Sequence, residues 1–212
     1  MALDGPLLVG IAGGSGSGKT ALVAAVSEVL RPAVVGRLAQ DAYYRDRSEL
    51  PDAARAGLNF DVPEALDLEL FVQHLRALRR GRPVRPPRYC FETHCRRGRG
   101  ERVGPADIIL VEGLWLLLDA SARELLDLRI YLEAPETLRL SRRLARDVSE
   151  RGRTPQSVVV QYQTSTVPAH RHYVEPSKAW ADLVLVNAGR LESVAEVAAT
   201  VIRTHHERRR VP

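Results

Sequence analysis

The sequence predicts an α/β fold, a doubly wound parallel sheet flanked by helices. Three observations predict it: a glycine-rich motif near the N-terminus, short apolar runs that recur along the chain, and helix-like stretches between those runs. Strands that alternate with helices favour a parallel sheet with helices on both faces. We expect a single domain over residues 1–212, because a chain of this length supports one sizeable core.

The glycine-rich motif directly follows the first apolar run. Its residues are Gly13, Gly14, Ser15, Gly16, Ser17, Gly18, Lys19 and Thr20. They fit the pattern G-x-x-x-x-G-K-[ST], in which backbone N–H groups wrap the phosphates of a nucleoside triphosphate at the start of a helix. Lys19 would reach the outer phosphates, and Thr20 would offer its hydroxyl to Mg²⁺. We expect this motif to bind ATP and a helix to follow over 21–30.

Short apolar runs predict the buried strands. They span 7–12, 108–112, 128–132 and 183–186, and a shorter run over 34–38 is a fifth candidate. Such near-continuous runs are typical of a sheet covered on both faces. Helices are expected over 65–80, from 135 to 152, and over 193–206, where Val194, Val197 and Val201 form an apolar stripe. Prolines and aromatics over about 81–104 predict a small inserted β-hairpin.

Composition and charge argue against several classes of protein. The net charge is +5, but the basic residues gather in 79–102, 139–153 and 208–210 rather than in one stripe interleaved with aromatics, so we expect no nucleic-acid ligand. Without an apolar run of about 18 residues we expect no membrane span. Without a basic segment before the first apolar run we expect a cytoplasmic location. Cys90, His94 and Cys95 are too few for a structural zinc site, so free thiols are expected.

Two carboxylates are candidates for the chemistry of phosphoryl transfer. Asp41 follows the 34–38 run, near the carboxyl edge of the sheet where ligands bind. It could accept the proton of an attacking hydroxyl, but an Asp at this place is equally common as a helix N-cap or turn residue. Glu112 ends an apolar run and could hold Mg²⁺ beside the phosphate loop. Its alternative, a solvent-facing carboxylate, is disfavoured by the apolar residues before it.

Arginines are concentrated after Pro135. They are Arg139, Arg142, Arg143, Arg146, Arg151 and Arg153. Arg139, Arg143 and Arg146 share one helix face, because they lie at spacings i, i+4 and i+7. Alone, this pattern fits a solvated face as well as a binding site. Next to a phosphate loop it predicts an arginine-rich lid over about 139–155 that neutralises the transferring phosphoryl group, with Gly152 as its flexible point.

Two further segments could contact the acceptor of the phosphate. Asn59-Phe60-Asp61 and residues 89–94 supply a carboxylate, aromatic rings and an imidazole. A carboxylate can accept hydrogen bonds from both hydroxyls of a ribose, and Tyr or His can stack on or hydrogen-bond a base. The residues alone favour a plainer interpretation, in which Phe60 and Phe91 are core residues and His94 lies in a surface loop.

Together these motifs resemble the uridine kinase family, within the wider phosphoribulokinase/uridine kinase group of P-loop kinases. The resemblance covers nearly the whole chain and includes, in order, 10–20, 40–44, 58–63, 111–113, 146–153, 161–162, 174–178 and 181–184. It implies ATP-dependent phosphorylation of the 5′-hydroxyl of uridine or cytidine to UMP or CMP, in pyrimidine salvage. It also implies a homotetramer that end-product nucleotides inhibit.

The resemblance implies roles for single residues as well. Asp41 matches the general base, and Arg146 and Arg151 match lid arginines that act with Lys19 on the phosphates. The substrate-binding positions are Tyr44, Phe60, Asp61, Tyr89, His94, Arg143, Arg153 and Gln161. Among them, Asp61 and Arg143 match the ribose-binding pair, while Tyr89 and His94 match the groups that read the pyrimidine. With Mg²⁺ as cofactor, the metal positions are Thr20 and Glu112.

Two segments depart from the family pattern. Tyr89-Cys90-Phe91 stands where Tyr-Asp-Phe is usual, beside the base-reading residues, and 186–189 reads Val-Asn-Ala-Gly instead of Pro-Arg-Gly-Gly, near the base of the donor. These departures bear on the choice of acceptor and donor. The alternatives are a kinase of the same fold for another hydroxylated metabolite, such as a sugar phosphate or a vitamin precursor, and a non-catalytic nucleotide-binding protein, for which the basic tail would be the feature.

Overall fold

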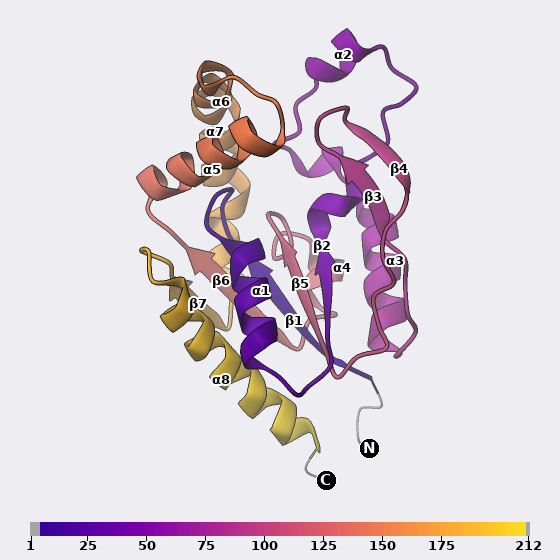
Figure 1. Ribbon diagram of the computed structural model, residues 1–212. Coiled ribbons are helices and arrows are strands. Elements are labelled where there is room, and N and C mark those ends of the chain that lie inside the picture. The colour runs from indigo at the N-terminus through magenta and orange to yellow at the C-terminus, as the bar shows by residue number, and fades with distance from the viewer. Residues whose placement is uncertain (1–4, 211–212) are drawn as a thin grey trace.

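A computed structural model describes residues 5–210, and within them it contains the predicted parallel sheet (Figure 1). The strands are β1 (Leu7–Ala12), β2 (Val35–Ala39), β5 (Ile108–Gly113), β6 (Leu128–Glu133) and β7 (Leu183–Val186). They lie in the order β2-β5-β1-β6-β7, and all neighbouring pairs are parallel. The predicted fold class is confirmed, as is each predicted strand, including the fifth candidate. The ends of the expected domain, 1–4 and 211–212, lie outside the described residues.

Side chains along β1 alternate between two apolar cores. Leu7, Val9 and Ile11 belong to the core that the sheet forms with α1 (Lys19–Val29) and α8 (Leu191–Arg210). Leu8 faces the opposite core, where Phe71 of α3 (Leu68–Arg79) packs. In Figure 1, α1 and α8 lie next to each other on one face of the sheet. Burial of both faces explains why the strand sequences are apolar without interruption.

The inserted hairpin is shorter than predicted. Its strands are β3 (Pro87–Cys90) and β4 (Cys95–Arg99), which pair antiparallel. Towards its base, the pairing is reduced to one isolated bridge between Val84 and Val103. Pro83 and Pro86 have no backbone N–H and cannot donate to a ladder, which accounts for the shorter strands.

Two predicted helices differ in detail. α3 begins at Leu68 rather than at 65, because Asp67 caps it by accepting a hydrogen bond from the Leu70 amide at 3.2 Å. The preceding Pro63–Ala65 is a separate 3₁₀ turn. In α8, the predicted valine stripe is wrong at Val197, which is 51% exposed. The buried face consists of Ala195, Ala198, Ala199 and Ile202, since small side chains let α8 approach α1 closely.

The arginine-rich helix is α5 (Glu136–Glu150), which confirms the helix expected after Pro135. The helical segment that follows was not predicted from the sequence. It consists of α6 (Pro155–Gln161), a π-helical turn (Tyr162–Thr166), α7 (Val167–Ala169), a second π-helical turn (His170–Val174) and a 3₁₀ turn (Pro176–Trp180). Polar residues and prolines interrupt the helical periodicity there. The remaining short helices are α2 (Asp52–Ala56) and α4 (Ala120–Arg123).

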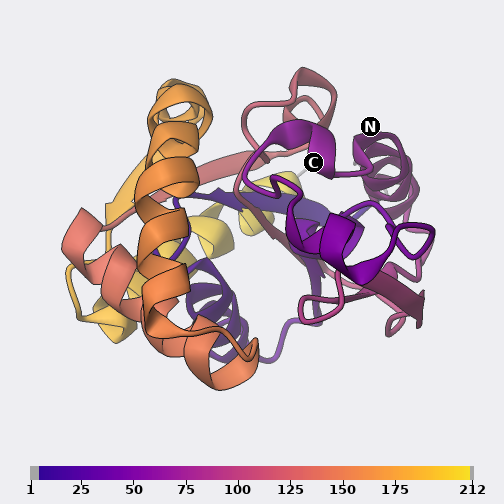
Figure 2. The same cartoon turned by 90° about the horizontal axis from the view of Figure 1, so that it is seen from above.

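Seen from above, the arginine-rich helices and the segment with α2 stand on opposite sides of the carboxyl edge of the sheet (Figure 2). The residues between them form the site described below. No helix within residues 5–210 is both long enough and apolar enough to cross a membrane.

Candidate active site

A cavity of about 290 Å³ lies at the carboxyl ends of β1, β2 and β5. Its walls come from the phosphate loop, the hairpin and the arginine-rich α5. The predicted residues that line it are Ser15, Gly16, Lys19, Thr20, Asp41, Tyr44, Phe60, Asp61, Tyr89, His94, Glu112, Arg143, Arg146, Arg151, Arg153 and Gln161. The structure thus brings nearly all predicted site residues together, and the others, Gly13, Gly14, Ser17 and Gly18, complete the loop behind them.

The phosphate loop has a conformation that depends on glycine. Gly16 has a φ of 76°, and a Cβ atom there would overlap the carbonyl oxygen of Arg139. The Lys19 ammonium donates hydrogen bonds to the carbonyl oxygens of Gly13 and Gly14, at 3.0 and 3.1 Å. Burial lowers the pKa of Lys19, and the nearby Glu112 carboxylate acts in the opposite direction. A bound phosphate would add negative charge beside this partly buried ammonium.

Glu112 and Thr20 form a corner rich in oxygen atoms next to Lys19. Glu112 is only 9% exposed, so the alternative of a solvent-facing carboxylate is wrong. Burial raises the pKa of Glu112, while Lys19 and a hydrogen bond with the Thr20 side chain oppose that rise. Mg²⁺ is typically held by one or two carboxylates together with phosphate oxygens and water. This donor set, with a desolvated carboxylate, fits Mg²⁺.

Asp41 lies in the 3₁₀ turn Gln40–Tyr43 that follows β2. Ala39 caps this turn, without a side-chain hydrogen bond. Of the two alternatives for Asp41, the N-cap role is therefore excluded, whereas the residue does lie in a turn. The turn is fixed by the buried Gln40, whose Oε1 accepts a hydrogen bond from the Trp115 amide at 3.0 Å. Asp41 lines the cavity and acts electrostatically on Lys19, which leaves its carboxylate available to a substrate.

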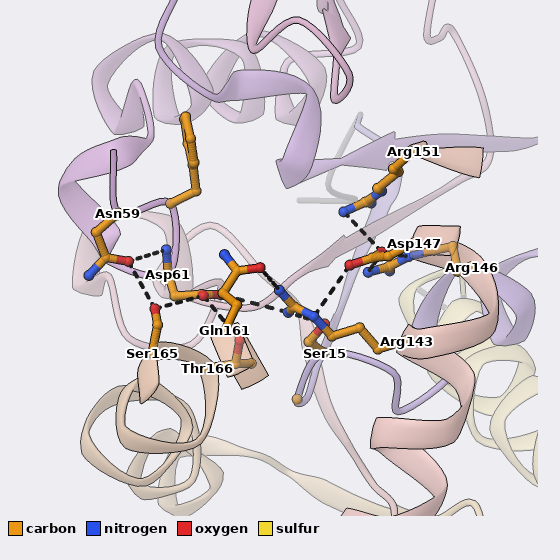
Figure 3. Close-up of polar contacts among 12 residues, drawn as sticks. Ser15, Asn59, Asp61, Arg143, Arg146, Asp147, Arg151, Gln161, Ser165 and Thr166 are labelled. Carbon is orange, nitrogen blue, oxygen red and sulfur yellow. Dashed lines mark hydrogen bonds and ion pairs between the residues drawn. The ribbon is translucent and has the colours of Figure 1, made fainter. Parts of the chain in front are cut away.

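The arginines of α5 are not a solvated face. Arg139 and Arg143 are 5% and 6% exposed. Arg143 donates to the Ser15 hydroxyl at 3.0 Å and to Gln161 Oε1 at 3.0 Å, so it joins the phosphate loop to α6 (Figure 3). On the other side of the cavity, the Arg151 guanidinium lies 4.1 Å from the centre of the Phe91 ring, a distance typical of cation–π contacts. The hairpin and the arginine-rich segment therefore meet over the cavity.

Asp61 is fixed by the π-helical turn after α6. Its Oδ2 accepts hydrogen bonds from the Ser165 hydroxyl at 2.8 Å and from the Thr166 hydroxyl at 3.0 Å (Figure 3). Its Oδ1 lies 3.7 Å from NH1 of Arg143. Sequence reasoning missed Ser165 and Thr166, because they lie more than a hundred positions from Asp61 and carry no local motif. The two hydroxyls orient the carboxylate and leave Oδ1 towards the arginine.

His94 lies at the tip of the hairpin and stacks on Phe60, with ring centres 4.1 Å apart and planes 10° from parallel. Its φ of 54° is unusual for a residue with a side chain, and such strain is concentrated at functional sites. Burial, reinforced by Arg151, lowers the pKa of His94. A neutral imidazole offers one donor and one acceptor. The plainer interpretation is correct in part, because Phe60 and Phe91 do pack against the apolar core and His94 does lie in the hairpin loop. It is incomplete, because all three rings also line the cavity.

Besides Ser165 and Thr166, sequence reasoning missed two buried residues at or beside the site. Asn187, in one of the departures from the family pattern, is 1% exposed and donates from Nδ2 to the Ser17 carbonyl oxygen at 2.9 Å, which ties the phosphate loop to the end of β7. Asp147 lines the cavity among the arginines and is 1% exposed. Its spacing, four positions from Arg143, was the available signal. The other departure, Cys90, is a free thiol outside the cavity lining.

A glycine-rich phosphate loop after β1 of a parallel sheet, with arginines and a buried strand-end carboxylate over the same cavity, defines a P-loop kinase. The model of the phosphoribulokinase/uridine kinase family matches residues 8–194. The chain belongs to this family.

Curated relatives agree with this membership, and a solved structure shares the fold. A uridine kinase of Geobacillus sp. (strain WCH70) is 39% identical over 199 residues, 94% of this chain and 94% of that protein. A uridine kinase of Clostridium botulinum (strain Okra / Type B1) is 42% identical over 184 residues, 87% of this chain and 89% of that protein. The phosphoribulokinase from Rhodobacter spheroides shares the fold, with a TM-score of 0.61 at 17% identity, over 86% of this chain and 70% of that chain.

Proposed function

We propose that this protein is an ATP-dependent kinase that transfers the γ-phosphate to the 5′-hydroxyl of uridine or cytidine. The observation that carries this proposal is that one cavity holds the phosphate loop with Lys19 together with Asp61 and His94. The phosphate loop and Lys19 supply a site for the phosphate donor. Asp61 and His94 supply groups suited to a ribose and a base. The named uridine kinases, similar over most of both chains, support the choice of acceptor.

On the donor side, the loop N–H groups and Lys19 would bind the phosphates of ATP. Arg146 and Arg151, on the opposite wall, would neutralise charge on the transferring phosphoryl group. Thr20 and Glu112 would hold Mg²⁺, and the bound ion would neutralise part of the charge of the phosphates. The buried Asn187 keeps the loop in place by its hydrogen bond to Ser17.

On the acceptor side, Asp61 would accept hydrogen bonds from the ribose hydroxyls and Arg143 would donate to them. Tyr89 and His94 would contact the edge of the pyrimidine, with Phe60 and Tyr44 packed beside them. Arg153 and Gln161 would close this end of the cavity. Asp41 would accept the proton of the 5′-hydroxyl as its oxygen attacks the γ-phosphorus and the bond to ADP breaks.

Two further parts of the proposal concern assembly and location. On the family resemblance, the protein would assemble as a homotetramer with nucleoside and ATP as its partners. On its composition and charge distribution, it would work in the cytoplasm without a role for nucleic acid or a membrane. Light scattering of the purified protein measures the assembly directly.

A panel of acceptors with Mg-ATP tests the function. We expect the kcat/KM for uridine or cytidine to exceed that for a purine nucleoside, a pentose phosphate and pantothenate by about 100-fold or more, since buried polar groups left unpaired penalise a wrong substrate strongly. ADP release measures turnover, and the Lys19→Met variant controls for contaminating ATPases. Turnover of another alcohol, with none on the pyrimidine nucleosides, would contradict the proposed acceptor and leave the kinase chemistry intact.

The ribose contact gives a second, independent prediction. Asp61→Asn is expected to raise the KM for uridine by about 10- to 100-fold, because a hydrogen bond to a charged acceptor contributes about 1.5–3 kcal/mol. The wild-type protein should prefer uridine to 2′-deoxyuridine, and the variant should lose most of that preference. Glu64→Gln, an exposed carboxylate three positions away, is the matched control. An unchanged preference in Asp61→Asn would place the ribose hydroxyls elsewhere.

A further inference from the structure

Asp147 is surrounded by four guanidinium groups. Its Oδ1 lies 2.8 Å from NH2 of Arg146 and 3.5 Å from NH1 of Arg151. Its Oδ2 lies 3.4 Å from Nε of Arg143 and 3.8 Å from NH1 of Arg153. The Asp147 side chain is 1% exposed, whereas three of its four partners are partly exposed towards the cavity. Figure 3 shows the carboxylate between the arginines.

These four arginines are the residues that the proposed function assigns to the phosphates and the nucleoside. Four cations that converge on one point repel one another strongly where water is scarce. One carboxylate offsets part of that repulsion, and it also orients the side chains, because each hydrogen bond or ion pair restricts a flexible guanidinium. In the described residues, Asp147 is the carboxylate that contacts all four.

The backbone reinforces this arrangement. Asp147 lies four positions after Arg143 and four before Arg151, so α5 and its end present both arginines to the carboxylate. The Arg153 amide donates to the Asp147 carbonyl oxygen at 3.1 Å, which returns the chain after Gly152 towards the cavity. Arg153 is also hydrogen-bonded to Gln161 and to the Ser157 carbonyl oxygen. Asp147 is thus the common point of the α5 end, the Gly152 turn and α6.

We infer that Asp147 is a positioning residue for phosphoryl transfer: it holds Arg143, Arg146, Arg151 and Arg153 along one wall of the cavity, so that Arg146 and Arg151 meet the donor phosphates, and Arg143 and Arg153 meet the acceptor, already oriented. This inference rests on the proposed kinase function. It differs from two other roles of a buried carboxylate. A carboxylate that only screens charge would hinder ATP binding, and its removal would speed the reaction. A carboxylate that only stabilises the fold would weaken folding, binding and turnover together when removed.

The substitution Asp147→Asn separates these roles, because it keeps the size of the side chain and removes its charge. We expect kcat to fall at least about tenfold, as for loss of oriented transition-state donors, while the dissociation constant for a fluorescent ATP analogue stays equal or decreases, since the wall becomes more positive. Asp147→Glu, which keeps the charge, is expected to recover part of kcat. Glu150→Gln, an exposed carboxylate on the same helix, is the matched control and should leave kcat within twofold.

Three results would overturn the inference. They are a kcat for Asp147→Asn within twofold of Glu150→Gln, an increase in kcat, or a parallel loss of kcat, ATP affinity and melting temperature. A readout that needs no substrate keeps the test independent of the proposed function. In NMR spectra of the free protein, Nε–H signals of Arg143 and Arg146 should be sharp in the wild type and broadened in Asp147→Asn. Unchanged arginine signals would contradict the positioning role even if the acceptor were not a nucleoside, whereas broadened signals in an enzyme inactive on nucleosides would refute only the proposed function.

Discussion

Asparagine in place of Asp41 is expected to lower kcat by a factor of about 100 or more and to leave ATP affinity nearly unchanged. The carboxylate lines the cavity without capping its own turn, so the amide can occupy the same space. An amide cannot accept the proton of the attacking hydroxyl, and the loss therefore falls on the chemical step. Steady-state turnover of uridine and titration with a fluorescent ATP analogue measure the two quantities.

The matched control for Asp41→Asn is Glu49→Gln. Glu49 lies a few positions further along, its side chain is 59% exposed, and it is outside the cavity lining. It should leave both quantities unchanged. If Asp41→Asn retained more than a third of the wild-type kcat, the proton would have to pass to another acceptor. If ATP affinity fell with kcat, Asp41 would act on the donor or the metal instead.

Lys19→Met is expected to lower kcat/KM for Mg-ATP by about 100- to 1000-fold, the effect of removing one preorganised donor to charge that develops in a transition state. Methionine has a similar length, so the loop keeps its volume, but the ammonium that bonds Gly13 and Gly14 is gone. Because the Lys19 ammonium is held by two loop carbonyls in a partly buried place, and desolvation lowers its pKa, bulk cations cannot replace it. ADP release with saturating uridine measures the loss.

The sequence offers a precise comparison for this variant, since its other lysine is Lys178. Lys178 forms an ion pair with Glu133 at 3.3 Å and lies outside the cavity lining. Lys178→Met should keep the wild-type kcat/KM. Near-normal activity of Lys19→Met would show that the phosphate loop works without its lysine, and an equal loss in both variants would point to stability rather than chemistry.

Most of the donor half of the site was predictable, because its signals are local. Gly13 to Thr20 carry the loop in consecutive residues, and Asp41 and Glu112 each follow an apolar run that ends at the carboxyl edge of the sheet. The sequence left two possible roles open for each of several charged residues. The structure removed the capping role of Asp41, the solvent-facing role of Glu112 and the solvated face of Arg139 and Arg143.

The acceptor half was less predictable from residues alone. The residues that orient Asp61 come from a π-helical turn that has no sequence pattern of its own. His94 was ranked as a surface residue, because neither its stacking on Phe60 nor its left-handed backbone can be read from a hairpin sequence. The predicted stripe on α8 failed at Val197 because close packing against α1 selects the alanine face.

By itself, the sequence determined the order of the five sheet strands and of the main helices between them, the phosphate loop and, through its motifs, the resemblance to the uridine kinase family. These follow from residues that are neighbours in the chain, where periodicity and backbone propensity act directly. The tertiary structure alone decided which charges meet. Asp147 contacts four arginines, and Asp61 accepts hydrogen bonds from two hydroxyls. Both arrangements depend on helices that are brought together by the burial of both faces of the sheet. The low exposure of these groups strengthens their ion pairs and hydrogen bonds.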